Sequence, residues 1–369
     1  MYLPEYIDEP LDKEIVQPAL ARRRSYLSIG WWRCGYSGYI LRRLLSFIPL
    51  AIGISIFTFV LIRLLPGDPA QVLAGSTPYS GVVEGIRARM GLDKPIPIQY
   101  FIYIKNVIHG DFGDSWFTGK PVAEDILARA PATFELITFG ITAATIFGLV
   151  LGLVGGLRPG GLVDRVGSIY GFTAGALPDF WLALLIIFVL FHLLHIIPPP
   201  MGRFPLSLTP PSTITGFYTI DALITGNMAA LRGAVGALVG PVLTLGLLYG
   251  GPIAKLTRQT MLDILQSDYI RFARACGVSD RAVATYAFRS ILPPVLTLIG
   301  WLYASLIGGA VLVETVFSWN GVGQYAVQSI VNKDYAPVQA FVLVAGIFSL
   351  SVYLVLDLLH MLVDPRVRL

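Results

Sequence analysis

Charged residues are scarce in this sequence of 369 residues. Asp, Glu, Lys and Arg make up 14% of it, against roughly 25% in an average soluble domain, whereas hydrophobic residues make up 55% and the mean hydropathy is +0.69. A water-soluble chain of this mass needs a polar shell, so the composition excludes an ordinary soluble protein. The abundance of aliphatic and aromatic residues excludes a disordered chain. We therefore expect the bilayer to be the solvent for most of the chain.

Cysteine and catalytic motifs are equally scarce. Cys34 and Cys276 lie far apart and fit no metal-ligand spacing, so they indicate neither a disulfide framework nor a zinc site. No G-x-x-x-x-G-K-[ST] motif occurs, so the chain itself has no P-loop for ATP. His192 and His195 could share a metal, but a pair at a membrane interface without a nearby carboxylate is more often solvated. We assign no catalytic residue, no metal ligand and no cofactor to this chain.

Long apolar runs are what the sequence does contain. A membrane-spanning helix needs roughly 20 apolar residues, and six segments qualify: 44–65, 136–157, 169–197, 234–253, 291–313 and 338–356. The third is too long for one straight crossing, and we expect a kink or a helix start at Pro178. Glycines recur every fourth residue, as in Gly148, Gly152 and Gly156, which favours close helix packing in lipid. The predicted fold is all-α and polytopic.

The positions of the basic residues predict the orientation. Lys and Arg in short loops stay in the cytoplasm, and with both termini inside, 17 of the 27 basic residues are cytoplasmic: Lys13, Arg22, Arg23, Arg24, Arg33, Arg42, Arg43, Arg158, Arg165, Lys255, Arg258, Arg271, Arg274, Arg281, Arg289, Arg366 and Arg368. The net charge of +4 is then an orientation signal, and nucleic-acid binding is unnecessary. We divide the chain into a cytoplasmic arm (1–40) and a six-span domain (41–369).

Two connections between spans carry structure of their own. Residues 66–133 predict a partly helical external subdomain, because the apolar residues after Pro95 fall on one helical stripe. Residues 198–233 read as a loop with one short helix at 218–224. Residues 255–290 are basic and rich in helix formers, and we expect two helices that meet at Gly277, with Ser279 as the N-cap of the second. An amphipathic helix there either docks a cytoplasmic partner or lies on anionic lipid.

Short motifs in this order resemble the permeases of binding-protein-dependent ABC transporters, in particular the dipeptide/oligopeptide family. The likeness covers about residues 40–366, and the residues that carry it are Pro66-Gly67-Asp68-Pro69, Gly91-Leu92-Asp93, Pro95, Gln99-Tyr100, Gly110-Asp111-Phe112-Gly113, Ser115, Asp268-Tyr269-Ile270-Arg271, Ala273-Arg274-Ala275, Gly277, Leu292-Pro293, Glu314, Phe317, Gly321, Gly323, Asp334-Tyr335, Val338-Gln339 and Asp364-Pro365-Arg366. Arg271-Phe272-Ala273 replaces the Glu-Ala-Ala of the general permease motif, which is usual for the peptide family. Asn320 stands where a proline is common.

The resemblance implies the permease subunit of an ATP-driven importer in the cell membrane. A second homologous permease, two cytoplasmic ATPases that hold ATP and magnesium, and an external substrate-binding protein would be its partners. The docking element for the ATPases would comprise Asp268, Tyr269, Arg271, Ala273, Arg274, Ala275, Gly277 and Val278. Docking of the binding protein would involve Gly67, Asp68, Gly110, Asp111 and Gly113. Cargoes in the family include peptides, nickel chelates, glutathione and oligosaccharides, and the residues do not choose among them.

Two other classes of function compete with this interpretation. A secondary transporter or channel usually carries ionisable residues deep in its spans, and these spans are nearly free of charge. A membrane enzyme needs a nucleophile or metal constellation that is not found. Asp179, Glu314 and Asp357 lie near the ends or the break of a span, where capping or interfacial solvation is the simplest role. Glu135 reads as an acid in the first turn of a helix.

Overall fold

A computed structural model describes residues 36–64, 80–89 and 93–363 of the chain. Gly67 and Asp68, two of the predicted docking residues, therefore lie outside the described residues, as do the arm before Tyr36 and the final motif Asp364-Pro365-Arg366. Helices make up nearly all of the regular structure. Within the described ranges the β structure consists of one isolated bridge between Asp114 and Pro121.

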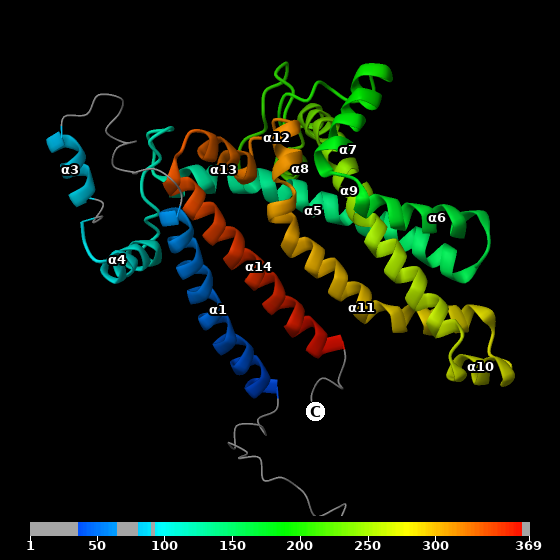
Figure 1. Ribbon diagram of the computed structural model, residues 1–369. Coiled ribbons are helices and arrows are strands. Elements are labelled where there is room, and N and C mark those ends of the chain that lie inside the picture. The colour runs from blue at the N-terminus through cyan, green and yellow to red at the C-terminus, as the bar shows by residue number, and fades with distance from the viewer. Residues whose placement is uncertain (1–35, 65–79, 90–92, 364–369) are drawn as a thin grey trace, which may run out of the picture.

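The helices follow one another along the chain, with a long loop between Leu193 and Tyr218. They are α1 (Tyr36–Leu64), α3 (Ser80–Arg89), α4 (Ile96–Ile108), α5 (Val122–Leu157), α6 (Leu162–Thr173), α7 (Asp179–Ile186), α8 (Tyr218–Ile224), α9 (Met228–Leu265), α10 (Asp268–Ala275), α11 (Asp280–Gly309), α12 (Val311–Val316), α13 (Val322–Val331) and α14 (Tyr335–Val363) (Figure 1). A 3₁₀ turn (Ala174–Ala176) follows α6, and a π-helical segment (Ile187–Leu193) continues α7. The short helix predicted at 218–224 is α8, with those bounds.

Among the residues that the structure describes, five helices are long and apolar enough to cross a bilayer, which confirms a polytopic membrane protein. The qualifying segments are Ile40–Leu61, Val122–Leu157, Met228–Leu265, Asp280–Gly309 and Tyr335–Leu359. The third predicted span is broken near Pro178, as expected, but the bend of 114° between its two helices is far larger than a proline kink. The number of spans is six if this bent pair is counted as one.

Several helices extend beyond the predicted spans. Helix α5 begins at Val122, 14 residues before Leu136, so the last part of the predicted external segment 66–133 is already helical and continuous with the span. Helix α9 continues to Leu265 and α11 begins at Asp280, so the predicted cytoplasmic segment 255–290 is helical over most of its length. Helices on both sides of Gly277 are present as expected, and only the boundaries of the spans differ, because hydropathy marks where a chain enters lipid, whereas backbone hydrogen bonds continue a helix into water.

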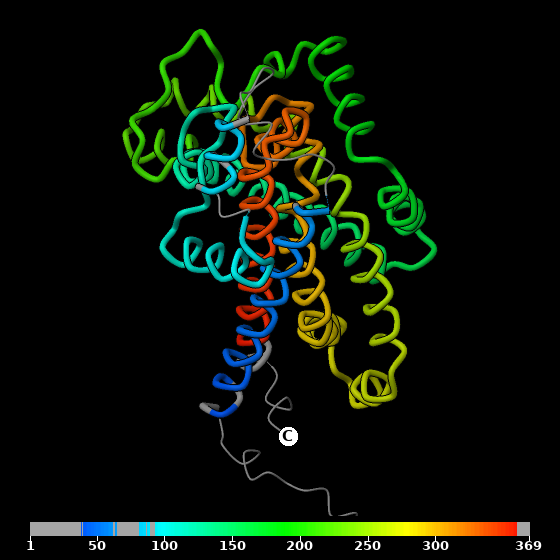
Figure 2. The backbone as a smooth tube through the Cα atoms, turned by 60° about the vertical axis from the view of Figure 1, so that its left-hand side comes forward, coloured from blue at the N-terminus to red at the C-terminus, as the bar shows by residue number. Residues whose placement is uncertain are grey.

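The long helices give the molecule an upper and a lower end, each with its own short helices. Figure 1 shows α8, α12 and α13 at the top, and α10 at the bottom together with the first turn of α1 and the last turn of α14; the rotated view in Figure 2 keeps this arrangement. The described termini and α10 therefore lie on one side. This agrees with the topology predicted from the basic residues, although which side faces the cytoplasm stays a prediction.

Glycines bring α5 and α9 into close contact. A Cβ added at Gly148 would lie 2.6 Å from the Cβ of Ile253, one at Gly152 2.6 Å from the Cβ of Thr257, and one at Gly156 2.7 Å from the Cβ of Met261. These are the glycines that the sequence placed on one helical face. Their lack of side chains lets α9 lie against the backbone of α5, and this contact forms the centre of the bundle.

The core continues toward the upper end of the molecule. Leu136, Leu245, Leu306, Val313 and Trp319 are fully or almost fully buried in one cluster that joins α5, α9, α11 and α12. In contrast, α1 exposes an apolar face with Leu45, Ile48 and Phe57. Such a face is typical of a helix that meets lipid chains. Helix α4 lies beside α1, where Ser55 and Tyr100 share a hydrogen bond of 2.8 Å.

Candidate functional site

Helix α10 connects the end of α9 to the start of α11, at the lower end of the bundle (Figure 1). Ser267 is the N-cap residue of α10. Its backbone has the extended conformation usual for that position, but its side chain makes no capping hydrogen bond. Ile270 is fully buried, whereas the side chains around it are exposed. A single apolar residue therefore anchors an otherwise exposed helix to α9 and α11.

The exposed face of α10 carries two aromatic residues. Tyr269 is 52% exposed and Phe272 is 71% exposed. Aromatic side chains with this exposure are typical anchors of protein–protein contacts. Asp268 and Arg271 lie beside them, with 3.7 Å between a carboxylate oxygen and a guanidinium nitrogen of two highly exposed side chains. An exposed pair of this kind contributes little to stability, so both charges remain available to a partner.

Gly277 ends α10 in the manner that the sequence predicts. Its φ is +80°, a left-handed conformation that glycine adopts without strain. The amide of Gly277 donates to the carbonyl of Arg274 over 2.9 Å, and the amide of Val278 donates to the carbonyl of Ala273 over 3.1 Å. This pair of hydrogen bonds is the Schellman motif of a helix C-terminus. No neighbouring atom lies within 4 Å of the position of a Gly277 Cβ, so the turn projects into open space.

The remaining predicted docking residues lie on the same short element. Arg274 and Ala275 are exposed, and Ala273 and Val278 are half-buried against the bundle. Ser279 occupies the N-cap position of α11, as the sequence predicts, although its side chain makes no capping hydrogen bond. The structure brings all eight predicted ATPase-docking residues into one turn between α9 and α11; their role stays a prediction.

The predicted binding-protein docking residues that the structure describes form a turn after α4. Gly110 and Gly113 have φ values of +81° and +85°, and the carboxylate of Asp111 accepts a hydrogen bond of 2.8 Å from the amide of Gly113. The side chain of Asp111 thus holds the turn as an Asx motif. All three residues are exposed.

A buried carboxylate fixes this turn to the start of α14. Asp334 is 2% exposed and accepts hydrogen bonds from the Ser115 hydroxyl over 2.6 Å and from the Phe117 amide over 3.3 Å. Burial raises the pKa of Asp334 above its ordinary value, although the hydrogen bonds from Ser115 and from the amides of Phe117 and Trp116 oppose the shift. Two motifs of the resemblance, 110–115 and 334–335, therefore form one structural unit.

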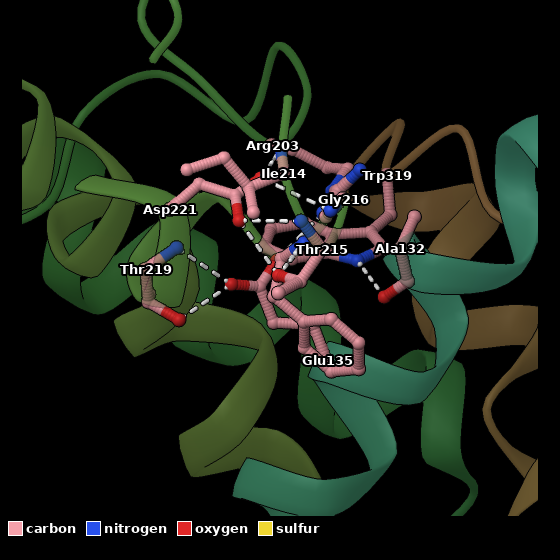
Figure 3. A network of polar contacts seen from close by, with 10 residues as sticks. Ala132, Glu135, Arg203, Ile214, Thr215, Gly216, Thr219, Asp221 and Trp319 are labelled. Atoms are coloured by element: carbon pink, nitrogen blue, oxygen red, sulfur yellow. Dashed lines mark hydrogen bonds and ion pairs between the residues drawn. The ribbon is translucent and has the colours of Figure 1, made fainter. Parts of the chain in front are cut away.

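Glu135 is the centre of a second buried network, shown in Figure 3. One of its oxygens accepts from the amide and hydroxyl of Thr219 over 2.9 Å and 2.6 Å, and the other forms an ion pair of 2.7 Å with Arg203. Its side chain is only 2% exposed. The expectation that Glu135 is a first-turn acid is wrong, because α5 begins 13 residues earlier; the residue instead fastens the loop before α8 to α5.

Glu314 is also a buried structural acid. It is fully buried and accepts hydrogen bonds from the Thr133 hydroxyl over 2.5 Å and from the Gln324 amide over 2.9 Å. Because Gln324 lies in the first turn of α13, the carboxylate caps that helix from outside it. A Cβ at Gly321 would collide with this carboxyl group. The expected capping role is therefore confirmed for Glu314, but solvation at an interface is wrong.

Other candidates from the sequence lie apart from these sites. Asp357 forms an ion pair of 3.0 Å with Arg43 near the lower end of α14. The ring of His192 stacks on Phe188 with 5.6 Å between centroids. Asp179 is half-buried at the break between α6 and α7, where the Tyr249 hydroxyl lies 3.5 Å from its carboxylate.

Sequence reasoning missed Arg203, Thr219 and Asp221. Asp221 accepts hydrogen bonds from the amides of Ile214, Thr215 and Gly216. Burial opposes ionisation of this carboxyl group, but the hydrogen bonds prevail and hold the pKa of Asp221 below its ordinary value. The one usable signal was the isolated Arg203 in a loop with few charges, since an unpaired charge in such a loop often has a buried partner.

Comparison with known proteins adds two family matches that together cover most of the chain. Residues 144–369 match the family described as "Binding-protein-dependent transport system inner membrane component". Residues 37–137 match the family described as "Binding-prot-dependent transport system membrane comp, N-term". The first match includes α10 and the second includes the turn at Gly110.

Curated relatives cover most of the chain and nearly all of their own length. The chain is 39% identical over 316 residues to the "Probable D,D-dipeptide transport system permease protein DdpB" of Escherichia coli K12, which covers 85% of this chain and 93% of the relative. It is 36% identical to the "Dipeptide transport system permease protein DppB" of Alkalihalophilus pseudofirmus (89% and 99%). It is 32% identical to the "Glutathione transport system permease protein GsiC" of Pectobacterium atrosepticum (89% and 98%).

Proposed function

The chain belongs to the family of binding-protein-dependent transport system inner membrane components, and from that premise we propose that it moves peptides across the cell membrane. As a member of the family it is a multi-pass permease subunit of an ABC importer rather than an enzyme. The names of relatives with dipeptide cargo support a short peptide as the substrate. The name of the glutathione relative keeps peptide-like molecules within the proposal.

Helix α10 is the observation that carries the proposal. It is a short helix with one buried anchor, Ile270, two exposed aromatic residues and exposed charges of both signs. It lies at the end of α9 and α11, which pack into the bundle. A partner that grips α10 therefore acts on two membrane helices at once.

The partners follow from the family. Permeases of ABC importers work with other permease, ATPase and binding-protein subunits. We propose that two cytoplasmic ATPases hold the ATP and magnesium, that one of them docks on α10, and that a homologous permease completes the pathway. The external binding protein would contact the turn at Gly110, Asp111 and Gly113, whose exposed backbone is held rigidly by Asp111 and Asp334.

Reconstitution tests the proposal directly. The chain is purified with a companion permease, ATPases and binding protein from the same gene neighbourhood and placed in lipid vesicles. We expect uptake of labelled dialanine that requires both ATP and the loaded binding protein. Dialanine uptake by this chain alone, without ATPases, would overturn the proposal.

Gly277 provides the matched pair of variants. Asparagine tolerates a left-handed backbone, so Gly277→Asn is expected to keep uptake coupled to ATP hydrolysis. Gly277→Trp strains the left-handed backbone and adds a large side chain to a turn that has open space in this chain, so it is expected to uncouple hydrolysis from uptake by at least about tenfold. Equal coupling in the two variants would contradict docking at this turn.

A further inference from the structure

Asp179 is a carboxylate inside the bundle whose role the proposed function leaves open. It starts α7 directly after the break in the third predicted span. An acid in the first turn of a helix is often explained by the helix dipole alone. Three further observations at this position point beyond that explanation.

The first observation is the absence of a positive partner. Within the described residues, the ion pairs involve Asp357, Glu135, Asp164 and Asp268, and no cation pairs with Asp179. The Tyr249 hydroxyl, 3.5 Å from one of its oxygens, is a weak neutral partner. A carboxylate held within membrane helices without a cation is costly and is therefore expected to have a function.

The second observation is how Tyr249 reaches this carboxylate. Tyr249 lies in the apolar part of α9, and a Cβ at Gly309 of α11 would occupy the place of its hydroxyl. The glycine thus makes room for the hydroxyl between α9 and α11. Tyr249 and Asp179 form a built polar pair at the meeting point of α7, α9 and the end of α11.

The third observation is the mixed surface of α11 next to this pair. Its exposed residues include Ser290, Thr297 and Ser305 at helical spacing, together with the apolar and aromatic residues Tyr286, Phe288, Leu296 and Trp301. The apolar face of helix α1, by contrast, exposes leucine, isoleucine and phenylalanine. Hydroxyl side chains on a membrane helix favour contact with protein or water over contact with lipid chains.

We propose that Asp179, positioned by Tyr249, receives the terminal ammonium group of a peptide during its passage through the permease. Every unblocked peptide carries this cation, whatever its side chains. The half-exposed carboxylate lies at a break between two helices, where membrane proteins commonly place polar groups for a passing substrate. The inference rests on the proposed peptide transport and adds a recognition group within the permease itself.

Uptake kinetics in the reconstituted importer test this role. Asp179→Asn keeps the size of the side chain and removes its charge, so KM for dialanine uptake is expected to rise by about tenfold, as for the loss of one charge-assisted contact. Asp179→Glu is expected to restore KM to within about threefold. Asp357→Asn, which removes a carboxylate at the far end of α14, is the matched control and is expected to leave KM unchanged.

The comparison of two cargoes separates recognition from structure. N-acetyl-dialanine lacks the ammonium group, and its affinity for the binding protein is measured separately so that the uptake can be corrected for it. Asp179→Asn is expected to leave the corrected uptake of this cargo unchanged. An equal loss for both cargoes, or an unchanged KM for dialanine, would overturn the role of Asp179. Failure of the wild-type importer to take up dialanine would instead refute the proposed function.

Discussion

Asp221 shows how a single carboxyl group holds the end of the loop before α8 in place. Its oxygens accept hydrogen bonds from three consecutive amides, at Ile214, Thr215 and Gly216, and from the Thr215 hydroxyl over 2.7 Å. Side chains that accept from successive amides fix the course of a chain that has no regular structure. The last residues of the loop before α8 therefore depend on this side chain for their course.

The lowered pKa of Asp221 predicts a pH dependence of stability. Because the folded pKa lies below the ordinary value of 3.8, the contribution of Asp221 is fully present above that pH and is lost as the pH falls through the folded pKa. The Tm of the wild type in detergent is expected to exceed that of Asp221→Asn at pH 7, and the difference is expected to shrink toward pH 3. A difference in Tm that stays constant over this range would contradict the assignment.

Gly321 is expected to resist substitution for a steric reason. A methyl group there would meet the carboxyl group of Glu314, which is fully buried and cannot move into water. Overpacking of this kind costs about 1–3 kcal/mol, so Gly321→Ala is expected to lower the Tm clearly. Gly53→Ala on α1, where nothing lies within 4 Å of the added Cβ, is the control and is expected to leave the Tm unchanged or raise it slightly.

Two nearby side chains of α10 have different roles: one anchors the helix to the bundle and the other faces outward. Ile270 is fully buried and Phe272 is 71% exposed. Ile270→Ala removes buried methyl groups and is expected to destabilise the protein by about 2–5 kcal/mol. Phe272→Ala is expected to leave the Tm unchanged and to weaken the coupling of ATP hydrolysis to uptake. If Phe272→Ala kept full coupling in vesicles, the exposed aromatic face would not be the docking surface.

At the level of elements, the sequence predicts helices well where local signals mark both ends. Helix α8 is flanked by turn residues and was predicted with its observed bounds, and Gly277 marked the turn after α10. The start of α5 was missed because residues 122–135 are helical without being a continuous apolar run. The role of Glu135 was missed because its partners, Arg203 and Thr219, lie 68 and 84 residues away.

The whole molecule has two distinct ends, and their sidedness can be measured. Cysteine replaces Ile108, which is 76% exposed at the end of α4, or Phe272 on α10, in a protein without Cys34 and Cys276. An impermeant thiol reagent added to intact cells is expected to label the cysteine at position 108. The cysteine at position 272 is expected to react only after permeabilisation, and the reverse pattern would invert the predicted topology.

At this scale the sequence predicts the number of apolar segments but not their shape. Hydropathy located all six segments, yet it carries no information on the bend of 114° in the third. That bend depends on contacts between distant residues, such as Ala174 against Gly251, where an added Cβ would lie 2.5 Å away.

The glycine contact between α5 and α9 limits how the molecule can move. Helix α9 has 38 residues, about 57 Å at 1.5 Å per residue, nearly twice the thickness of the hydrocarbon core. Because side chains of α9 fit against bare backbone on α5, the two helices cannot slide past each other without steric collision. A force applied at α10 is therefore expected to move the two helices together. Their other end carries the Glu135 and Glu314 networks, so a small movement at one end of the molecule is expected to displace the loops at the other.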